Sequence, residues 1–149
     1  MSEVFHNPWL SAAFGDAEVS SYLTPEVQLL NMLRIEVAHC RILGNENAAK
    51  AIENAKLKLS DLALVTAPDG VPIPELIRLL KAQSDQALHC DIHRGLNSQD
   101  VIDTALVLSL KAILPIFEAR IKEVLNALKL LNVPQGRNPL LGLYLWKII

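Results

Sequence analysis

The sequence predicts an all-α protein, and three observations support that prediction. Aromatic residues make up only 5% of the 149 residues, and the alternation of apolar and polar positions that marks strands is hard to find. Apolar residues instead recur at helical spacing, and typical helix-capping residues stand between the apolar runs. We expect a small helical domain over residues 1–97 and the start of a longer helical-bundle domain over residues 98–149.

The helix boundaries can be predicted from capping and turn residues in chain order. Thr-Pro-Glu at residues 24–26 predicts the start of the first helix, and Gly44 predicts its end. Asn45 then caps a second helix that reaches about Leu57. A short helix begins near residue 60 and ends at the turn 68–70, and Pro74 opens the next helix. A polar stretch follows, and residues 94–97 are typical of a loop.

The longest predicted helix runs from Ser98 to about Asn132, and a connector follows over residues 133–139. Its apolar residues cover most of the helix circumference, which is typical of a helix buried on several sides. The shorter helices could cover one side only, so we expect the remaining cover to come from other chains. Pro115 removes one backbone hydrogen bond and predicts a kink.

Composition and charge exclude several classes of protein. The net charge is −2 and the pI about 6.1, so nothing predicts binding to nucleic acid or to an anionic membrane. Lys111 interrupts the most apolar stretch, and the N-terminus lacks a signal-peptide pattern. We therefore expect a cytoplasmic protein with reduced cysteines. Because 51% of the residues are hydrophobic, we also expect a homo-oligomer, a dimer or tetramer.

The segment 93–100 is the best candidate for a binding site, because a loop there leads into the longest helix. Free backbone N–H groups and the helix dipole at such a start favour an anion, and Gly95 permits a close backbone approach. Asn97 and Ser98 can donate hydrogen bonds, and His93 or Arg94 can add positive charge. The alternative is that Asn97 or Ser98 merely caps the helix.

A second candidate is a metal site formed by the neighbouring residues His89, Cys90, Asp91 and His93. Their loop-like surroundings and the lack of a further ligand pair argue against it, so we expect no metal. We expect His39 to be structural, and Glu36 and Arg34 to make surface or inter-helix contacts.

The segment His-Arg-Gly-Leu-Asn-Ser-Gln-Asp-Val-Ile-Asp-Thr-Ala-Leu at residues 93–106 resembles the first signature region of the fumarase/aspartase superfamily. Its cycloisomerase and adenylosuccinate lyase branches carry His-x-Gly-x-Thr-Ser-x-Asp-Val-x-Asp-Thr there, so Asn97 stands at the usual Thr position. Residues 5–18 and 71–76 are similar to the 3-carboxy-cis,cis-muconate cycloisomerase family. The resemblance covers nearly all of this chain and about the first third of a family member.

This resemblance implies an all-helical homotetramer whose long helices form a central bundle, with active sites built from three subunits. It implies that the first signature region binds a substrate carboxylate, which makes His93, Asn97, Ser98 and Gln99 the predicted substrate-binding residues. The cycloisomerases close a tricarboxylate diene into a lactone in aromatic-acid catabolism. They use neither a metal nor an organic cofactor.

The other two signature regions of the family are not matched. Residues 142–147 stand where the family has Gly-x-Thr-His/Arg-x-Gln, but Tyr144, Leu145 and Lys147 replace the polar residues. The Gly-Ser-Ser loop of the third region has no counterpart. We therefore expect a truncated form without catalytic residues of its own, inactive alone. The alternatives are a non-catalytic helical oligomer, or a member closer to the adenylosuccinate lyases.

Overall fold

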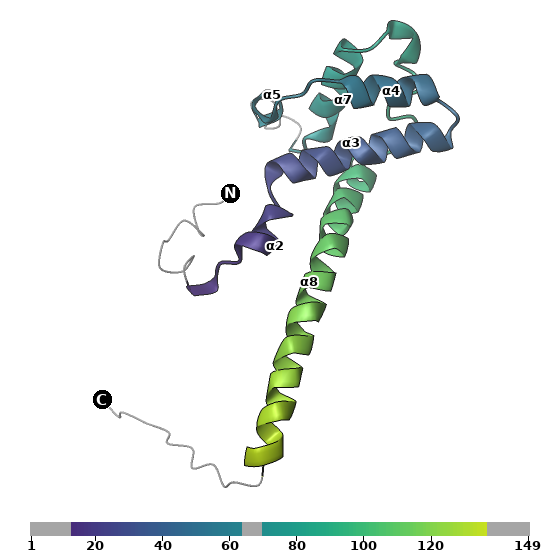
Figure 1. Cartoon of the computed structure of the whole chain (residues 1–149). Coiled ribbons are helices and arrows are strands. Elements are labelled where there is room, and N and C mark those ends of the chain that lie inside the picture. The colour runs from purple at the N-terminus through teal and green to yellow at the C-terminus, as the bar shows by residue number, and fades with distance from the viewer. Residues whose placement is uncertain (1–12, 64–69, 137–149) are drawn as a thin grey trace. The chain divides into compact units, whose positions relative to one another are not determined.

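The computed structural model describes residues 13–63 and 70–136, and every regular element in these two ranges is a helix (Figure 1). This confirms the all-α prediction. The chain forms two compact units, Met1–Ile113 and Leu114–Ile149, which are described separately. The elements are α2 (Ala17–Ser21), α3 (Pro25–Ile42), α4 (Glu46–Asn54), α5 (Leu59–Ala63), α7 (Ile73–Ala82), the 3-10 helix η2 (Gln86–Leu88) and α8 (Ser98–Gln135).

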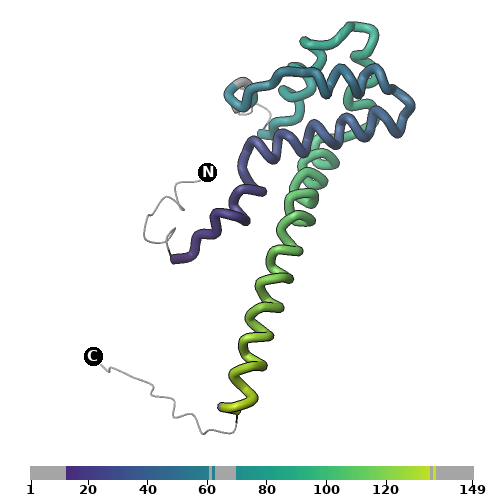
Figure 2. The backbone as a smooth tube through the Cα atoms, viewed as in Figure 1, coloured from purple at the N-terminus to yellow at the C-terminus, as the bar shows by residue number. Residues whose placement is uncertain are grey.

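Helices α3 and α4 form a hairpin in the first unit and lie side by side (Figure 2). As predicted, Thr24 caps α3: its Oγ1 accepts a hydrogen bond from the Val27 backbone at 3.3 Å. Gly44, with φ 80°, takes the left-handed conformation that ends a helix. Ala48 and Ala49 are fully buried, and their short side chains let α4 approach α3 closely.

Two predicted helix ends and one absent helix require correction. The second helix ends at Asn54 and not at Leu57, because the Gln83 side chain bonds the backbone N and O of Lys56 at 2.8 and 3.1 Å. The short helix α2, which Asp16 caps, was not predicted. The last helix continues past Asn132 to Gln135, since a single Pro in its final turn removes only one hydrogen bond. The kink at Pro115 stays a prediction, and α8 continues on both sides of it.

The start of α8 completes the core of the first unit. Its buried residues Val101, Ala105, Ser109 and Ile113 recur every four positions and form one stripe. Asn31, which is 3% exposed, donates to Ala105 O at 3.2 Å and to Ser109 Oγ at 3.1 Å, so α3 and α8 are joined by buried hydrogen bonds. The larger buried side chains of the core are Ile52, Ile73, Leu76, Leu80, Ile92 and Val101.

The second unit contains the remainder of α8, and its apolar side chains are exposed in the single chain. Leu114, Phe117, Ile121 and Leu128 range from 43% to 63% exposed. The prediction that other chains cover this helix is therefore not tested by one chain. Among the described helices, none combines the length and the apolar character that a membrane span needs.

Candidate functional site

The loop between η2 and α8 contains the predicted site, and its backbone is shaped by two residues in the left-handed region. His93 has φ 62° and Gly95 has φ 79°. Glycine adopts this conformation freely, but a histidine there costs about 1–3 kcal/mol. Ile92, which is 2% exposed, anchors the loop in the core. The strained backbone of His93 therefore lies next to a residue that is packed in the core.

His93 contacts a buried carboxylate on α3. Its Nδ1 lies 2.6 Å from Oε1 of Glu36, and the two side chains are 18% and 0% exposed. The second oxygen of Glu36, Oε2, is buried without a hydrogen-bond partner. A buried carboxylate normally accepts several hydrogen bonds, so Glu36 is under-satisfied. The sequence prediction that Glu36 makes an inter-helix or surface contact missed this role.

Two further residues of α3 hold the same loop. His39 Nε2 lies 2.7 Å from the Arg94 carbonyl oxygen, which confirms the predicted structural role of His39. The Cys40 thiol donates to the carbonyl oxygen of Asp91 at 3.5 Å. Burial raises the pKa of this thiol, and the negative charges of Glu36 and Asp91 raise it further. Cys40 therefore stays a neutral thiol and a hydrogen-bond donor.

At the start of α8, Asn97 caps the helix, as the simpler sequence reading allowed. Its Oδ1 accepts from the Asp100 backbone N–H, and its own N–H donates to Asp100 Oδ2, both at 2.9 Å. The backbone N–H groups of Asn97 and Asp100, which were expected to bind an anion, are thus already bonded. The Asp100 carboxylate also adds a negative charge at the start of α8. Asn97 keeps its side-chain NH₂ group for other partners, and the half-buried Ser98 takes no part in the capping pair. Gln99 is exposed and donates to Asp103 at 2.5 Å.

His93, Asn97 and Ser98 all lie in the segment 93–98 that leads into α8, and Gln99 bonds to Asp103 along the helix surface. Substrate binding by these residues stays a prediction. The side chains available to a carboxylate are the imidazole of His93, the amide of Asn97 and the hydroxyl of Ser98. Arg94 is exposed and lies 3.7 Å from Asp91.

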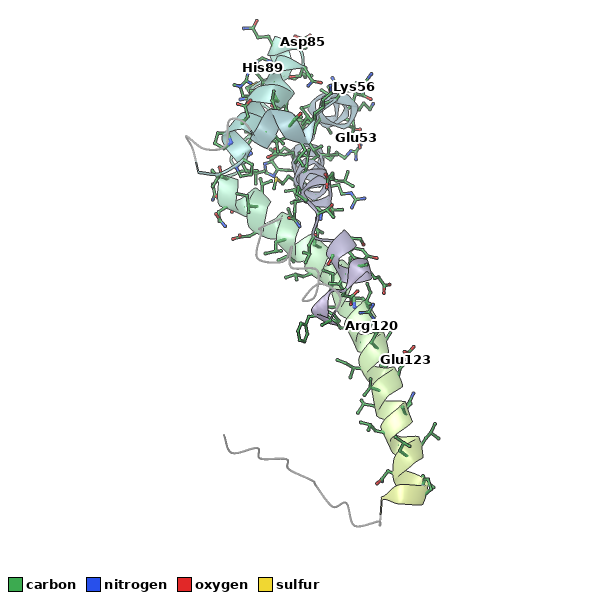
Figure 3. The ribbon with its side chains drawn as sticks, turned by 90° about the vertical axis from the view of Figure 1, so that its left-hand side faces the viewer. Glu53, Lys56, Asp85, His89, Arg120 and Glu123 are labelled. Carbon is green, nitrogen blue, oxygen red and sulfur yellow. The ribbon has the colours of Figure 1, made fainter. Side chains whose placement is uncertain are left out.

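The alternative metal site does not form in the described part of the chain, where no group of three potential ligands comes together. His89, labelled in Figure 3, bonds through Nε2 to the Lys81 carbonyl oxygen at 2.8 Å. His93 bonds to Glu36, and the exposed Cys90 bonds to the Ala87 carbonyl oxygen at 3.8 Å. The three side chains thus have different neighbours.

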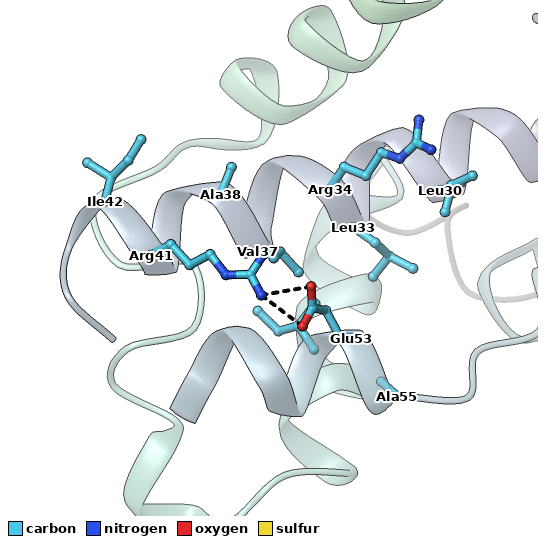
Figure 4. A pocket seen from close by; sticks show the side chains of 10 residues that line it. Leu30, Leu33, Arg34, Val37, Ala38, Arg41, Ile42, Glu53 and Ala55 are labelled. Atoms are coloured by element: carbon cyan, nitrogen blue, oxygen red, sulfur yellow. Dashed lines mark hydrogen bonds and ion pairs between the residues drawn. The ribbon is translucent and has the colours of Figure 1, made fainter. Parts of the chain in front are cut away.

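A groove of about 550 Å³ lies elsewhere, between α3 and α4 (Figure 4). Its apolar walls include Leu33 and Val37, and an ion pair of 2.9 Å between Arg41 and Glu53 crosses it. None of the four predicted substrate-binding residues lines this groove. It is therefore separate from the loop at residues 93–99.

No model of a protein family matches the sequence. The chain is similar to trans-aconitate decarboxylase 1 of Mycosarcoma maydis, with 27% identity over 145 residues. The match covers 91% of this chain and 29% of the decarboxylase, so the chain spans less than a third of that relative. This match supports a distant relationship to that enzyme and does not single out a cycloisomerase. Two of the predicted similarities fall outside the described residues: residues 5–12 of the N-terminal pattern, and residues 139–147, which stand at the second signature region.

Proposed function

We propose that this chain carries the carboxylate-binding segment of a fumarase/aspartase-type enzyme that acts on an unsaturated tricarboxylate. The observation that carries the proposal is the loop at residues 93–99, which contains a strained histidine and, four and five residues later, an amide and a hydroxyl that can donate hydrogen bonds. Backbone strain that the surrounding structure maintains is concentrated at functional sites in proteins.

The named substrates of the two similar enzymes support this choice of ligand. Trans-aconitate and 3-carboxy-cis,cis-muconate are both unsaturated tricarboxylates, although one enzyme is a decarboxylase and the other a cycloisomerase. A loop that binds one carboxylate would serve either reaction, because both begin with the same recognition. We propose 3-carboxy-cis,cis-muconate cyclisation as the ancestral reaction, on the similarity of residues 5–18 and 71–76 to the cycloisomerase family.

We further propose that this chain alone binds such a ligand and does not convert it. Leu145 stands where the family places a polar residue. Positioned acids and bases contribute large rate factors, so a site without them retains little rate enhancement. Mixing identical copies does not restore these groups, because every copy lacks them.

Calorimetric titration with trans-aconitate and with 3-carboxy-cis,cis-muconate tests the binding. We expect Ser98→Ala to weaken binding about tenfold or more, since a hydrogen bond to a charged group contributes about 1.5–3 kcal/mol. The matched control is Ser84→Ala, at a serine whose hydroxyl bonds to the Lys81 carbonyl oxygen. No binding of either acid, or equal affinities in the two variants, would contradict the proposal. If the parent protein removes the diene absorbance of 3-carboxy-cis,cis-muconate and Ser98→Ala does not, the claim that the chain is inert is wrong.

Substitutions at Asn97 separate its capping role from ligand binding. Asn97→Asp keeps a good cap, so we expect little change in the free energy of unfolding but weaker binding of the tricarboxylate, since the new charge repels it. Asn97→Ala should lower the free energy of unfolding by about 1 kcal/mol. Chemical denaturation and calorimetric titration measure the two effects. If Asn97→Asp binds the acids as the parent protein does, Asn97 is a cap and nothing more.

We also propose that second copies of this chain cover the exposed face of α8. From Val107 to Leu131 the spacing of one set of apolar residues alternates between three and four positions, which is the heptad pattern of a left-handed coiled-coil contact. Exposed apolar residues at neighbouring positions, such as Leu106 and Leu125, widen the stripe and favour more than two helices. The residues of this heptad seam are Val107, Leu110, Leu114, Phe117, Ile121, Val124, Leu128 and Leu131.

A further inference from the structure

Glu36 is placed where a carboxylate is unfavourable for folding. Its side chain is 0% exposed, it faces the core side of α3, and Oε2 has no partner. Removing a carboxylate from water is costly unless hydrogen bonds and an opposite charge compensate. Even a complete buried ion pair is often no more stabilising than well-packed apolar residues of the same volume, although removing one partner of a formed pair is costly. The contribution of Glu36 must therefore be sought outside the stability of the fold.

Within the described ranges, the one side-chain hydrogen bond of Glu36 leads to a second unfavourable feature, the strained backbone of His93. It joins Oε1 to Nδ1 of His93, whose φ of 62° is the one left-handed value of a non-glycine residue in the described ranges. The two residues are 57 positions apart in the sequence, so the pair is a product of tertiary folding. An under-satisfied buried acid and a strained histidine thus meet at the loop to which we assign ligand binding.

We propose that Glu36 is the positioning residue of His93, and that it holds the proton on Nδ1 so that Nε2 is presented to the ligand. This inference rests on the proposed function, because it assigns His93 a ligand to face. An ionised carboxylate can only accept hydrogen bonds, so Nδ1 must donate. In a neutral imidazole the other nitrogen, Nε2, is then the acceptor, and its orientation is fixed by the same bond.

The neighbours of the pair agree with this arrangement. His39 bonds the Arg94 carbonyl oxygen and Cys40 bonds the Asp91 carbonyl oxygen, so both side chains secure the backbone and leave the imidazole to Glu36. No hydrogen bond to His93 Nε2 is formed within the described ranges. Asp91 and Arg94, which flank His93 in the sequence, contact each other at 3.7 Å.

Nitrogen-15 NMR of the His93 ring in the free protein tests the proposal, with Glu36→Gln and Glu36→Leu as variants. Under conditions where the ring is neutral, we expect the proton on Nδ1 in the parent protein. Glu36→Gln retains it, because the amide oxygen still accepts. Glu36→Leu removes the acceptor and shifts the ring toward the Nε2-protonated form. A proton on Nε2 in the parent, or an unchanged Nδ1 signal in Glu36→Leu, would overturn the proposal.

Titration with trans-aconitate then separates this proposal from the proposed function. We expect Glu36→Leu to lose affinity as much as His93→Ala does, at a temperature at which both variants are folded. Glu36→Gln should stay within a few-fold of the parent. If the parent binds and Glu36→Leu binds equally well, positioning by Glu36 is wrong and the proposed function stands. If the tautomer changes as expected but no protein binds the acid, the ligand assignment fails and the positioning role remains.

Discussion

Ile121→Glu converts the protein from an oligomer into a monomer, if the heptad seam of α8 is the contact between copies. Ile121 is 59% exposed in the single chain and lies at the middle of the seam. In an assembled bundle a glutamate there would be buried without a partner, at a cost of several kcal/mol in each subunit. We expect the dissociation constant of the oligomer to rise at least about a hundredfold. Multi-angle light scattering across a dilution series measures the change.

The matched control is Asn126→Glu, which adds the same charge to an exposed position of α8 outside the seam. We expect this variant to keep the mass of the parent. A parent protein that is already monomeric at high concentration would refute the proposal that second copies cover α8. Dissociation of both variants alike would show that added charge, and not the seam, decides assembly.

Leu76→Ala has the largest expected effect on the fold of the first unit. Leu76 is fully buried on α7 and belongs to the core between α3, α4 and the start of α8. Truncation removes buried apolar surface and leaves a cavity, which destabilises proteins by about 2–5 kcal/mol. For a domain of this size each kcal/mol lowers the melting temperature by about 4–8 °C. Thermal unfolding at a fixed protein concentration should therefore show a loss of at least about 8 °C.

Leu30→Ala is the control, because it makes the same chemical change at a position that is 47% exposed. We expect it to lower the free energy of unfolding by less than about 1 kcal/mol. Equal losses in the two variants would mean that α7 does not form the core described above.

Part of the candidate site could be predicted from the sequence. The spacing within residues 93–106 identified the loop, and the same residues predicted that Asn97 could cap α8, which its bonds to Asp100 confirm. Glu36 could not be assigned to this loop, because a pair separated by 57 residues leaves no local pattern. One signal was available: Met32, Glu36 and Cys40 are spaced by four, and this places an acid on an apolar face.

The sequence by itself determined the helical class and most helix starts, because capping and turn residues act within one helical turn of the backbone they bond. Thr24 and Gly44 are examples, and both lie where they were predicted to act. Tertiary structure alone decided where α4 ends, since the Gln83 side chain takes the backbone of Lys56. It also decided which carboxylate faces His93, because only packing brings distant helices within hydrogen-bond reach.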